Sequence, residues 1–463
     1  MSNPEVGLLQ TLRQRGLLHQ VSDEAALSVH LDSGVGAHAG AGRAVYCGFD
    51  PTADSLTIGN LVPIILLRHF QLAGHTPVVV MGGGTGLIGD PSGKTAERQL
   101  RTRDEVESNV RSQMRIFGRV LDFSDSTPNR ARMVNNADWL TRLSFLDALR
   151  DVGKHFSVNV MIQRDSVRER LHNREQGISY TEFSYILLQA YDFLVLFRDH
   201  AAHGVRQPVT IQCGGSDQWG NMVGGIELIR RVRAVESARA GAEAESGEPH
   251  APAFCLTAPL VTKADGGKFG KTESGAIWLT PERTSPYNFY QFWLNSADAD
   301  VVRFLRLFTF LPMAEIDRLE ASLQADPGKR EAHRTLAREM TRLLHGEEEL
   351  AKAEAAAGAL FGKRTADDDG PFVLPEDLLA SAPGSTHDRR LLDGVGVSLV
   401  DVLAQTTLAK SKTEARTLLM QNSISVNGRK AAADARLTTA SLIPGDLIAL
   451  RRGSKAWHIT RWS

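Results

Sequence analysis

The sequence predicts an α/β protein with a parallel-sheet core, a following α-helical segment and a small terminal α+β domain. The first observation is a βαβ pattern, in which the apolar runs Ala44–Phe49 and Pro77–Met81 flank a helix-like stretch at residues 58–73. Strand, helix and strand in this order are typical of a parallel sheet covered by helices. The second observation is charge, because residues 391–463 contain ten Lys or Arg and five Asp or Glu, a net of +5, against −6 for the remainder.

Composition limits the class of protein. The 463 residues suggest about three domains. The net charge of −1 excludes a uniformly basic nucleic-acid binder, but it allows a basic module balanced by an acidic body. Three cysteines far apart in the sequence exclude a disulfide framework. No long apolar run opens the chain and no uncharged stretch is long enough to span a membrane, so we expect a soluble, cytoplasmic protein.

The other elements follow from periodicity and turn residues. Residues 8–30 predict one amphipathic helix, and residues 184–197 predict a long helix with aromatic side chains on one face. Pro208–Cys213 reads as a further buried strand. Residues 98–170 are mostly helical and charged, and residues 298–360 are all-helical.

These elements predict a division of the chain. Residues 1–297 hold the N-terminal helix and the parallel-sheet domain, with a helical insert at about 125–170 and an exposed insertion at 231–252. The remaining segments are a helical domain at 298–362, a linker at 363–390 and the terminal domain at 391–463.

The segment from Tyr46 to Asn60 (YCGFDPTADSLTIGN) stands at the carboxyl end of the first strand and opens a helix. Open α/β sheets bind ligands at that edge, and a helix N-terminus offers N–H groups to phosphate. Gly59 would let a flat ligand approach the backbone. A plain strand-to-helix turn capped by Ser55 or Thr57 also explains this spacing.

The segment Gly82–Lys94 follows the second strand and is rich in glycine. It fails the phosphate-loop pattern, because Ile88 stands where the first glycine is required. It is also a poor dinucleotide fingerprint. Asp90, just past a strand end, could instead hold a ligand ammonium.

Three further groups could carry chemistry. Tyr185, Gln189 and Asp192 are spaced i, i+4 and i+7, so they share one helical face. Asp217 follows a strand and could hold a pair of ribose hydroxyls. Lys268 and Lys271 lie in a glycine-containing loop and suggest a mobile phosphate clamp. A partly exposed helix face, a capped turn and a solvated basic loop are the alternative interpretations.

Taken in order, these segments resemble the bacterial tyrosyl-tRNA synthetases, a class I family. The matching motifs are YCGFDPTADSL, GLIGDPSGK, DVGKHFSVN, GISYTEFSY, LQAYDF, GGSDQWGN, PLVTKADGGKFGKT and TSPYNFYQFW. The dense part of the match runs from residue 46 to about 310. The resemblance implies a Rossmann-like catalytic core.

The resemblance also implies residue roles. The substrate tyrosine would be bound by Tyr46 and Asp192 at its phenol, by Asp90, Tyr185 and Gln189 at its ammonium, and by Gln218 near its carboxylate. ATP would be bound by Asp50, Gly59, Asn60, Asp217 and Lys271. The catalytic group would be Thr57, Asn60, Lys94, Lys268, Lys271 and Thr272. Mg²⁺ would arrive on the ATP phosphates, and no metal-binding residues are expected in the protein.

One motif departs from the family. Thr57 and Asn60 stand where the HIGH motif has histidine first and histidine or asparagine last. Both can donate hydrogen bonds but neither carries charge, so the lysine loop would carry more of the activation step. A catalytically weak RNA-binding paralogue and a related tryptophanyl-type synthetase are the alternatives.

The terminal domain resembles the S4 RNA-binding fold through the segments VSLVDVLA, SKTEARTLL and ISVNG. Its expected RNA-binding residues are Lys410, Lys412, Arg416, Arg451 and Arg452. The partners implied are L-tyrosine, ATP and tRNA(Tyr). The resemblance further implies a homodimer, with its interface in the segment around residues 135–170.

Overall fold

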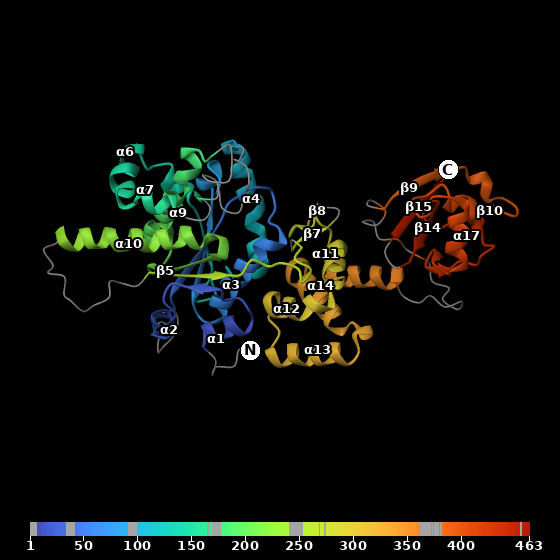
Figure 1. Ribbon diagram of the computed structural model, residues 1–463, viewed down its shortest axis with the longest axis horizontal. Coiled ribbons are helices and arrows are strands. Elements are labelled where there is room, and N and C mark those ends of the chain that lie inside the picture. The colour runs from blue at the N-terminus through green and yellow to red at the C-terminus, as the bar shows by residue number, and fades with distance from the viewer. Residues whose placement is uncertain are drawn as a thin grey trace. The chain divides into compact units, whose positions relative to one another are not determined.

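The computed structural model forms two compact units, which are described separately (Figure 1). The first contains residues up to Thr284 together with Trp293–Leu344, and the second contains Ser285–Phe292 and His345–Ser463. The residues described are 7–33, 42–90, 100–163, 167–168, 177–239, 253–267, 269–272, 275–361, 372, 374, 379, 382–453 and 456–463.

The core of the first unit is a six-stranded sheet with the order β1-β6-β5-β2-β3-β4. Its strands are β1 (Gln20–Val21), β2 (Ala44–Phe49), β3 (Thr76–Met81), β4 (Arg132–Asn135), β5 (Val209–Gly215) and β6 (Phe254–Ala258). The edge strand β1 is antiparallel to β6, and the other pairings are parallel. The predicted α/β fold class with a parallel-sheet core is confirmed.

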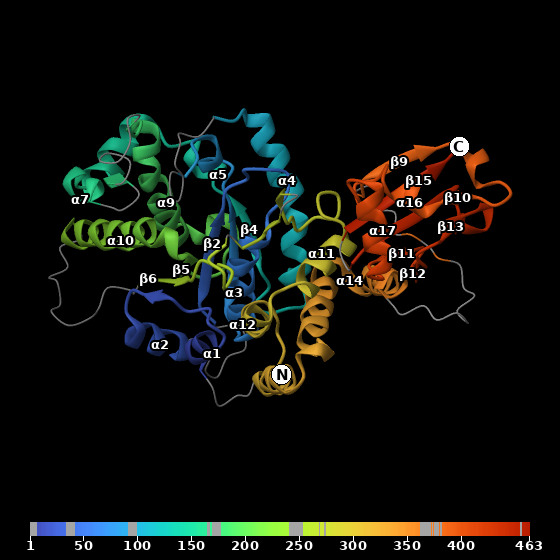
Figure 2. The same ribbon diagram turned by 45° about the vertical axis from the view of Figure 1, so that its right-hand side comes forward.

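Helices cover both faces of this sheet, as Figures 1 and 2 show. The helices are α3 (Leu61–Leu72), preceded by the 3₁₀ turn η1 (Ile58–Asn60), α4 (Arg103–Val120), α9 (Tyr180–Arg198) and α10 (Trp219–Arg239). Apolar residues of α9 and α10 pack with those of β2, β3 and β5 in one buried cluster. Between β4 and α9 lie the short helices α5 (Ala137–Leu140), α6 (Phe145–Asp147), η3 (Ala148–Val152), η4 (Gly153–His155) and α7 (Val158–Ile162).

Several sequence expectations differ from the structure. The single helix predicted at 8–30 is wrong, because β1 pairs with β6 and divides the segment into α1 (Leu8–Gln14) and α2 (Glu24–Ser33). The reading of 98–170 as mostly helical missed β4. Helix α10 continues to Arg239, into the insertion expected at 231–252, and residues 240–252 lie outside the described residues.

The helical segment contains α11 (Pro286–Leu294), α12 (Asp298–Phe308), α13 (Met313–Ala325) and α14 (Glu331–Phe361). Gly346 interrupts α14 with a φ of 87°, a left-handed value that favours glycine. The two units divide next to this glycine, at 344/345. The boundary predicted at 297/298 is therefore not where the compact units separate.

The second unit contains a five-stranded sheet with the order β12-β11-β14-β15-β9. Its strands are β9 (Gly384–His387), β11 (Ile424–Val426), β12 (Arg429–Lys430), β14 (Leu447–Arg452) and β15 (Ala456–Trp462). Helices α16 (Leu399–Leu403) and α17 (Lys412–Met420) pack on one face, and β10 (Val397–Ser398) pairs with β13 (Arg436–Leu437). Because β9 is paired with β15, this fold begins inside the linker expected at 363–390.

Within the described residues, no helix combines the length and the apolar character that crossing a membrane requires.

Candidate active site

A pocket of about 740 Å³ opens at the carboxyl ends of β2 and β5 and at η1. Strand β2 has β3 on one side and β5 on the other, so the pocket lies at the switch point where open α/β sheets bind ligands. All its lining residues belong to the first unit. The pocket brings together many of the predicted site residues: Tyr46, Asp50, Thr57, Gly59, Asn60, Asp90, Tyr185, Gln189, Asp192, Asp217 and Gln218.

The buried end of the pocket is formed by Tyr46 from β2 and Asp192 from α9, which are 1% and 5% exposed. The hydroxyl of Tyr46 has no hydrogen-bond partner among the described residues. A buried polar group left unpaired costs about 1–3 kcal/mol. The buried end is therefore prepared for a ligand that brings a polar atom with it.

Two residues outside the predicted set hold the Asp192 carboxylate. Asn136 donates through Nδ2 to Oδ2 over 2.9 Å, and Trp139 donates through Nε1 to Oδ1 over 2.7 Å. Both follow β4, the strand that the sequence reading missed. The signal available in the sequence was the pair Met133–Val134 followed directly by two asparagines.

Burial controls the protonation of this end. Burial raises the pKa of Asp192 to about 7, although the hydrogen bonds from Asn136 and Trp139 work in the opposite direction. Burial and the neighbouring Asp192 raise the pKa of Tyr46 well above its ordinary value. Tyr46 is thus a neutral hydroxyl, and Asp192 is an acceptor that ionises near neutral pH.

The middle of the pocket collects acceptor oxygens. The Tyr185 hydroxyl donates to Oδ2 of Asp50 over 2.9 Å, so its own oxygen is left to accept. Burial and Asp50 raise the pKa of Tyr185 well above its ordinary value, which keeps that proton in place. Gln218 donates to Oδ2 of Asp90 over 2.7 Å. Such a group suits a cationic ligand atom such as an ammonium.

Asp50, expected to contact ATP, lines the pocket and also accepts hydrogen bonds inside the protein. It accepts from Tyr185 over 2.9 Å and from Thr85 over 2.7 Å. Thr85 in turn accepts from Nδ2 of Asn136 over 3.0 Å. A chain of hydrogen bonds therefore connects Asp192 with Asp50, and Asp50 helps to orient Tyr185.

The open end of the pocket contains Thr57, Gly59 and Asn60 at the start of α3. The backbone N–H of Thr57 and its hydroxyl both donate to Oδ1 of Asn60, over 3.0 and 2.9 Å. The proton of the Thr57 hydroxyl is therefore used inside the protein. Both residues were expected to be able to donate, and in the structure the Thr57 hydroxyl donates to Asn60, whose Oδ1 is used as an acceptor and whose amide nitrogen remains a donor.

The lysine loop joins this open end through its backbone. Lys268 and Lys94 lie outside the described residues, and Lys271 and Thr272 form β7 (Lys271–Thr272), which pairs with β8 (Gly275–Ala276). After the loop, Ile277 accepts from Ile58 N over 3.0 Å and donates to Gly270 O over 2.9 Å.

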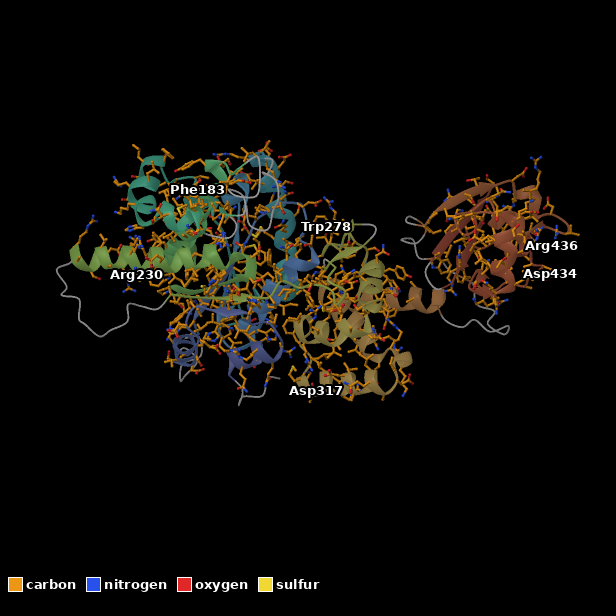
Figure 3. All side chains as sticks on the ribbon, in the orientation of Figure 1. Phe183, Arg230, Trp278, Asp317, Asp434 and Arg436 are labelled. Atoms are coloured by element: carbon orange, nitrogen blue, oxygen red, sulfur yellow. The ribbon has the colours of Figure 1, made fainter. Side chains whose placement is uncertain are left out.

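Aromatic and charged contacts anchor both ends of the loop. Before it, Ala264 donates to the Asp300 carboxylate over 3.0 Å. Within it, Phe269 packs on Phe308 with ring centroids 5.3 Å apart. After it, Trp278, labelled in Figure 3, lines the pocket and carries the Arg283 guanidinium 4.9 Å from its ring centre.

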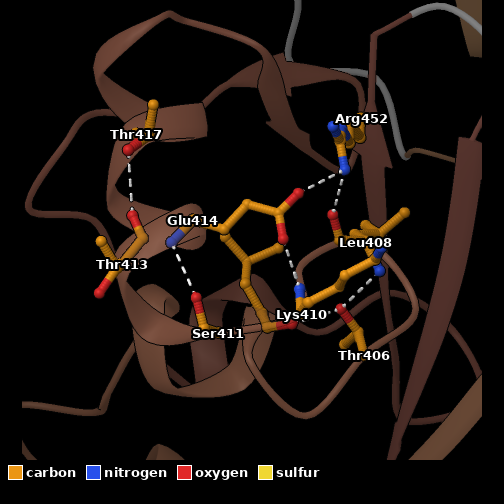
Figure 4. A network of polar contacts seen from close by, with 9 residues as sticks. Thr406, Leu408, Lys410, Ser411, Thr413, Glu414, Thr417 and Arg452 are labelled. Carbon is orange, nitrogen blue, oxygen red and sulfur yellow. Dashed lines mark hydrogen bonds and ion pairs between the residues drawn. The ribbon is translucent and has the colours of Figure 1, made fainter.

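The expected RNA-binding residues of the second unit do not form one surface. Lys410, Lys412 and Arg416 lie exposed at the start of α17. Arg452 bonds to Glu414 and to the Leu408 carbonyl, over 3.1 and 3.0 Å, and Glu414 also accepts from Lys410 N over 2.7 Å (Figure 4).

Through these two bonds, Arg452 holds the loop at residues 408–412 in position. Arg451 points to the opposite face of the sheet and stacks on Trp457 at 5.2 Å.

Among the described residues, no group of three or more His, Cys, Asp or Glu side chains is placed to hold a metal ion.

Comparison with known proteins identifies the family. The family described as tRNA synthetases class I (W and Y) matches residues 41–362. The chain belongs to this family. A second family, the tyrosine–tRNA ligase SYY-like C-terminal domain, matches residues 389–460.

Individual relatives agree with this assignment. A tyrosine–tRNA ligase of Roseiflexus castenholzii is 48% identical over 98% of this chain and 99% of its own length. One of Dechloromonas aromatica is 46% identical over 98% and 99%. Among solved structures, a C-terminally truncated mitochondrial tyrosyl-tRNA synthetase of Aspergillus nidulans has a TM-score of 0.65 at 28% identity, covering 77% of this chain and 94% of that one.

Proposed function

We propose that this class I synthetase is a tyrosine–tRNA ligase, which activates L-tyrosine with ATP and transfers it to the 3′-terminal ribose of tRNA(Tyr). The observation that carries the proposal is the buried Tyr46 hydroxyl beside Asp192, which has no hydrogen-bond partner among the residues that the structure describes. A phenol placed there donates to Asp192 and accepts from Tyr46. The relatives named tyrosine–tRNA ligase support the same substrate.

Selectivity follows from hydrogen bonding in a dry site. Phenylalanine at this end would leave the Tyr46 hydroxyl unpaired and would bury Asp192 without its third donor. Unpaired buried groups cost more than a lost apolar contact. The indole of tryptophan has a donor but no acceptor, so it could not satisfy Tyr46.

The activation step depends on alignment. With the phenol at the buried end and the ammonium near Tyr185, Gln189 and Asp90, the carboxylate of tyrosine points toward the open end. There it attacks the α-phosphorus of ATP, whose Mg²⁺ complex is the substrate, and pyrophosphate leaves. Asn60, Gln218 and the N–H groups at the start of α3 would donate to the developing negative charge. Asp217 would bind the ribose.

The lysine loop would act on the leaving group. Lys268, Lys271 and Thr272 approach the pyrophosphate when the loop closes, and Lys94 would lie near it. Interactions that form only on closure stabilise the transition state more than the bound substrates, so they raise turnover. The fixed ends of the loop limit this motion to the residues between Ala264 and Ile277.

The second step brings tRNA. The terminal ribose hydroxyl attacks the carbonyl of tyrosyl-adenylate, and AMP leaves. Lys410, Lys412 and Arg416 would bind tRNA phosphates, and Arg452 would hold their loop in position. Arg451 would contribute from the other face of the sheet. Removal of residues 391–463 should spare adenylate formation and reduce tRNA charging.

We propose that the protein is a cytoplasmic homodimer. Exposed apolar side chains of the first unit support the dimer. Phe145, Leu146, Val158 and Val160 are between 55% and 75% exposed, although all four are apolar. Exposed apolar groups concentrated in one segment are typical of an interface. Leu146→Glu should shift the protein from dimer to monomer in sedimentation, and an unchanged mass would contradict this interface.

The decisive experiment is amino-acid-dependent ATP–pyrophosphate exchange with the full chain. Exchange with tyrosine, but not with tryptophan or phenylalanine, is expected. Exchange with tryptophan alone would indicate the related tryptophanyl-type enzyme. Absence of exchange with every amino acid, with tRNA binding retained, would indicate a weak RNA-binding paralogue.

A further inference from the structure

Helix α4 carries a stripe of three arginines that the proposed function does not use. Arg111, Arg115 and Arg119 follow one another at intervals of four residues, so they lie on one face, and all three are exposed. The helix rises about 6 Å between successive members. We call these three residues the α4 stripe.

Among the described residues, the α4 stripe makes fewer close ion pairs than some exposed arginines on other helices of this unit. Like charges at i and i+4 destabilise a helix, and the α4 stripe contains two such pairs. On α10 and α13, by contrast, Arg230 pairs with Glu227 and Arg318 with Glu315, each over 2.8 Å. Arg230 is labelled on α10 in Figure 3.

Acidic neighbours neutralise only part of the α4 stripe. Arg115 and Arg119 make no ion pair with any residue that the structure describes, and Arg111 reaches Glu107 at 3.8 Å. The helix dipole favours a cation in the last turn, which accounts for Arg119 alone. Glu107 accounts for Arg111, so Arg115 is the member of the stripe that neither the dipole nor an ion pair among the described residues explains.

A glycine leaves space beside the arginines. Gly118 is exposed, and a Cβ added there would meet nothing within 4 Å, so packing does not require a glycine. Glycine weakens a helix relative to alanine. Without a side chain at this position, the backbone of a partner can approach α4 closely.

The other face of α4 supports the pocket. Asn109 donates to the Pro51 carbonyl over 3.0 Å, and Gln113 donates to the Ala53 carbonyl over 2.8 Å. Pro51 and Ala53 belong to the turn between β2 and η1, next to pocket residues Asp50 and Thr52. The α4 stripe is therefore about one helix diameter, roughly 10–12 Å, from that turn. Figure 2 shows α4 along the outside of the unit.

We propose that the α4 stripe binds the phosphate backbone of tRNA next to the 3′ end that enters the pocket. The inference rests on the proposed function, which supplies the tRNA. The chain outside residues 391–463 carries a net charge of −6, so a polyanion can approach the pocket only over local basic surfaces. Guanidinium groups suit phosphate, because each can donate two parallel hydrogen bonds.

The test uses the full chain with all three arginines changed to glutamine. Tyrosine-dependent pyrophosphate exchange should stay within twofold of the parent, while KM for tRNA in aminoacylation rises about tenfold. The logarithmic dependence of tRNA affinity on salt should become shallower by about 2, because each lost phosphate contact removes about 0.7–0.9. The triple lysine variant keeps the charge and should retain most of the affinity.

Gly118 provides a second, independent variant. Gly118→Glu places a negative charge beside the arginines and should raise KM for tRNA at least as much as the glutamine variant. Gly118→Ala should behave like the parent, because its Cβ enters open space. Both substitutions are on an exposed helix face, so their folding can be confirmed by circular dichroism.

Three results would overturn the proposal that the α4 stripe binds tRNA. The first is parent-like charging and salt dependence in the glutamine variant. The second is an equal loss of exchange and charging, which would mean that α4 acts only through the turn at Pro51 and Ala53. The third is parent-like tRNA affinity in Gly118→Glu. If the parent itself shows no tyrosine-dependent exchange, the proposed function fails. Direct measurement of tRNA binding by the same variants still tests whether the α4 stripe binds tRNA.

Discussion

The buried end and the open end of the pocket are built on different principles. At the buried end, Asp192 already accepts from Asn136 and Trp139, and Tyr46 is enclosed by the sheet. At the open end, Gly59 is exposed, Asn60 is half-buried, and the lysine loop is held through backbone bonds at its ends. The buried end is thus hydrogen-bonded within the protein in advance, whereas, on the proposed function, ATP and closure of the lysine loop would complete the open end.

The difference teaches where binding energy is used. Donors fixed around Asp192 pay their ordering cost during folding, so the phenol meets a rigid site. Groups that become ordered only with ATP contribute mainly in the transition state. Substitutions at the buried end should therefore raise KM for tyrosine or abolish activity, whereas substitutions at the open end should lower kcat.

The variant with the largest expected effect is Asp192→Ala, which tests the buried end of the pocket. The change removes the acceptor of Asn136, of Trp139 and of the substrate phenol, and so leaves these three donors without it in a dry site. We expect kcat/KM for tyrosine in pyrophosphate exchange to fall at least about 10³-fold, or about 4 kcal/mol. Tyr46→Phe removes a hydroxyl that bonds to no other described residue, so it should cost only about tenfold. Unchanged exchange in Asp192→Ala would remove Asp192 from the site.

The open end is tested by Gly270→Ala. Gly270 has a φ of 74°, and an added Cβ would lie 2.4 Å from Cγ2 of Ile58 at the start of α3. The loop would be pushed away from the phosphate site, so kcat for exchange should fall about 30-fold, or about 2 kcal/mol, with KM for tyrosine nearly unchanged.

Gly266→Ala is the matched control, because Gly266 has a φ of 79° with open space around its Cβ position. Its backbone strain is similar, but it has no contact with Ile58. Equal losses in the two variants would show that strain, not the contact with Ile58, limits activity.

The buried end also predicts a pH dependence. The phenol donates to ionised Asp192, whose pKa is raised by burial to about 7. The ionised fraction falls about tenfold between pH 8 and pH 6, so KM for tyrosine should rise about tenfold, while KM for ATP at saturating tyrosine changes little. A flat profile for tyrosine would mean that Asp192 is ionised throughout.

The same pKa affects stability. The folded-state pKa of Asp192 lies above its ordinary value of 3.8, so the folded protein binds the extra proton between about pH 4 and pH 7. This group therefore contributes stability at low pH that is lost as the pH rises through 7. Asp192→Asn should gain thermal stability over the parent at pH 8 and less at pH 5.

Sequence patterns predicted three of the four interior strands of the first sheet, missing β6, and neither of its edge strands. The strands at Ala44–Phe49, Pro77–Met81 and Pro208–Cys213 are continuous apolar runs, which parallel central strands require because both faces are buried. The edge strands β1 and β4 are short and half-buried, so their periodicity is weak. The edge strands β1 and β4 form because they pair with strands far away in the sequence, and a local sequence pattern cannot predict such pairing.

The same limit applies to the site. Tyr46, Tyr185, Gln189 and Asp192 could be proposed from strand ends, helix spacing and family resemblance, and the structure brings them to one pocket. Asn136 and Trp139 were missed because their function depends on the edge strand β4. Hydrogen-bond direction was also beyond the sequence, since the position of the Thr57 proton depends on Asn60.

The smallest predicted effect separates Thr57 from Asn60. The Thr57 hydroxyl donates to Oδ1 of Asn60, which leaves the Asn60 amide nitrogen to donate to phosphate. Thr57→Val keeps the shape and the backbone N–H bond to Oδ1, so Asn60 stays oriented and kcat for exchange should fall only about threefold. Asn60→Ala removes the donor itself and should cost about tenfold or more. A larger loss in Thr57→Val than in Asn60→Ala would mean that Thr57 contacts phosphate directly. The open end would then resemble the buried end, because the Thr57 hydroxyl would be a polar group kept available for the phosphate of ATP.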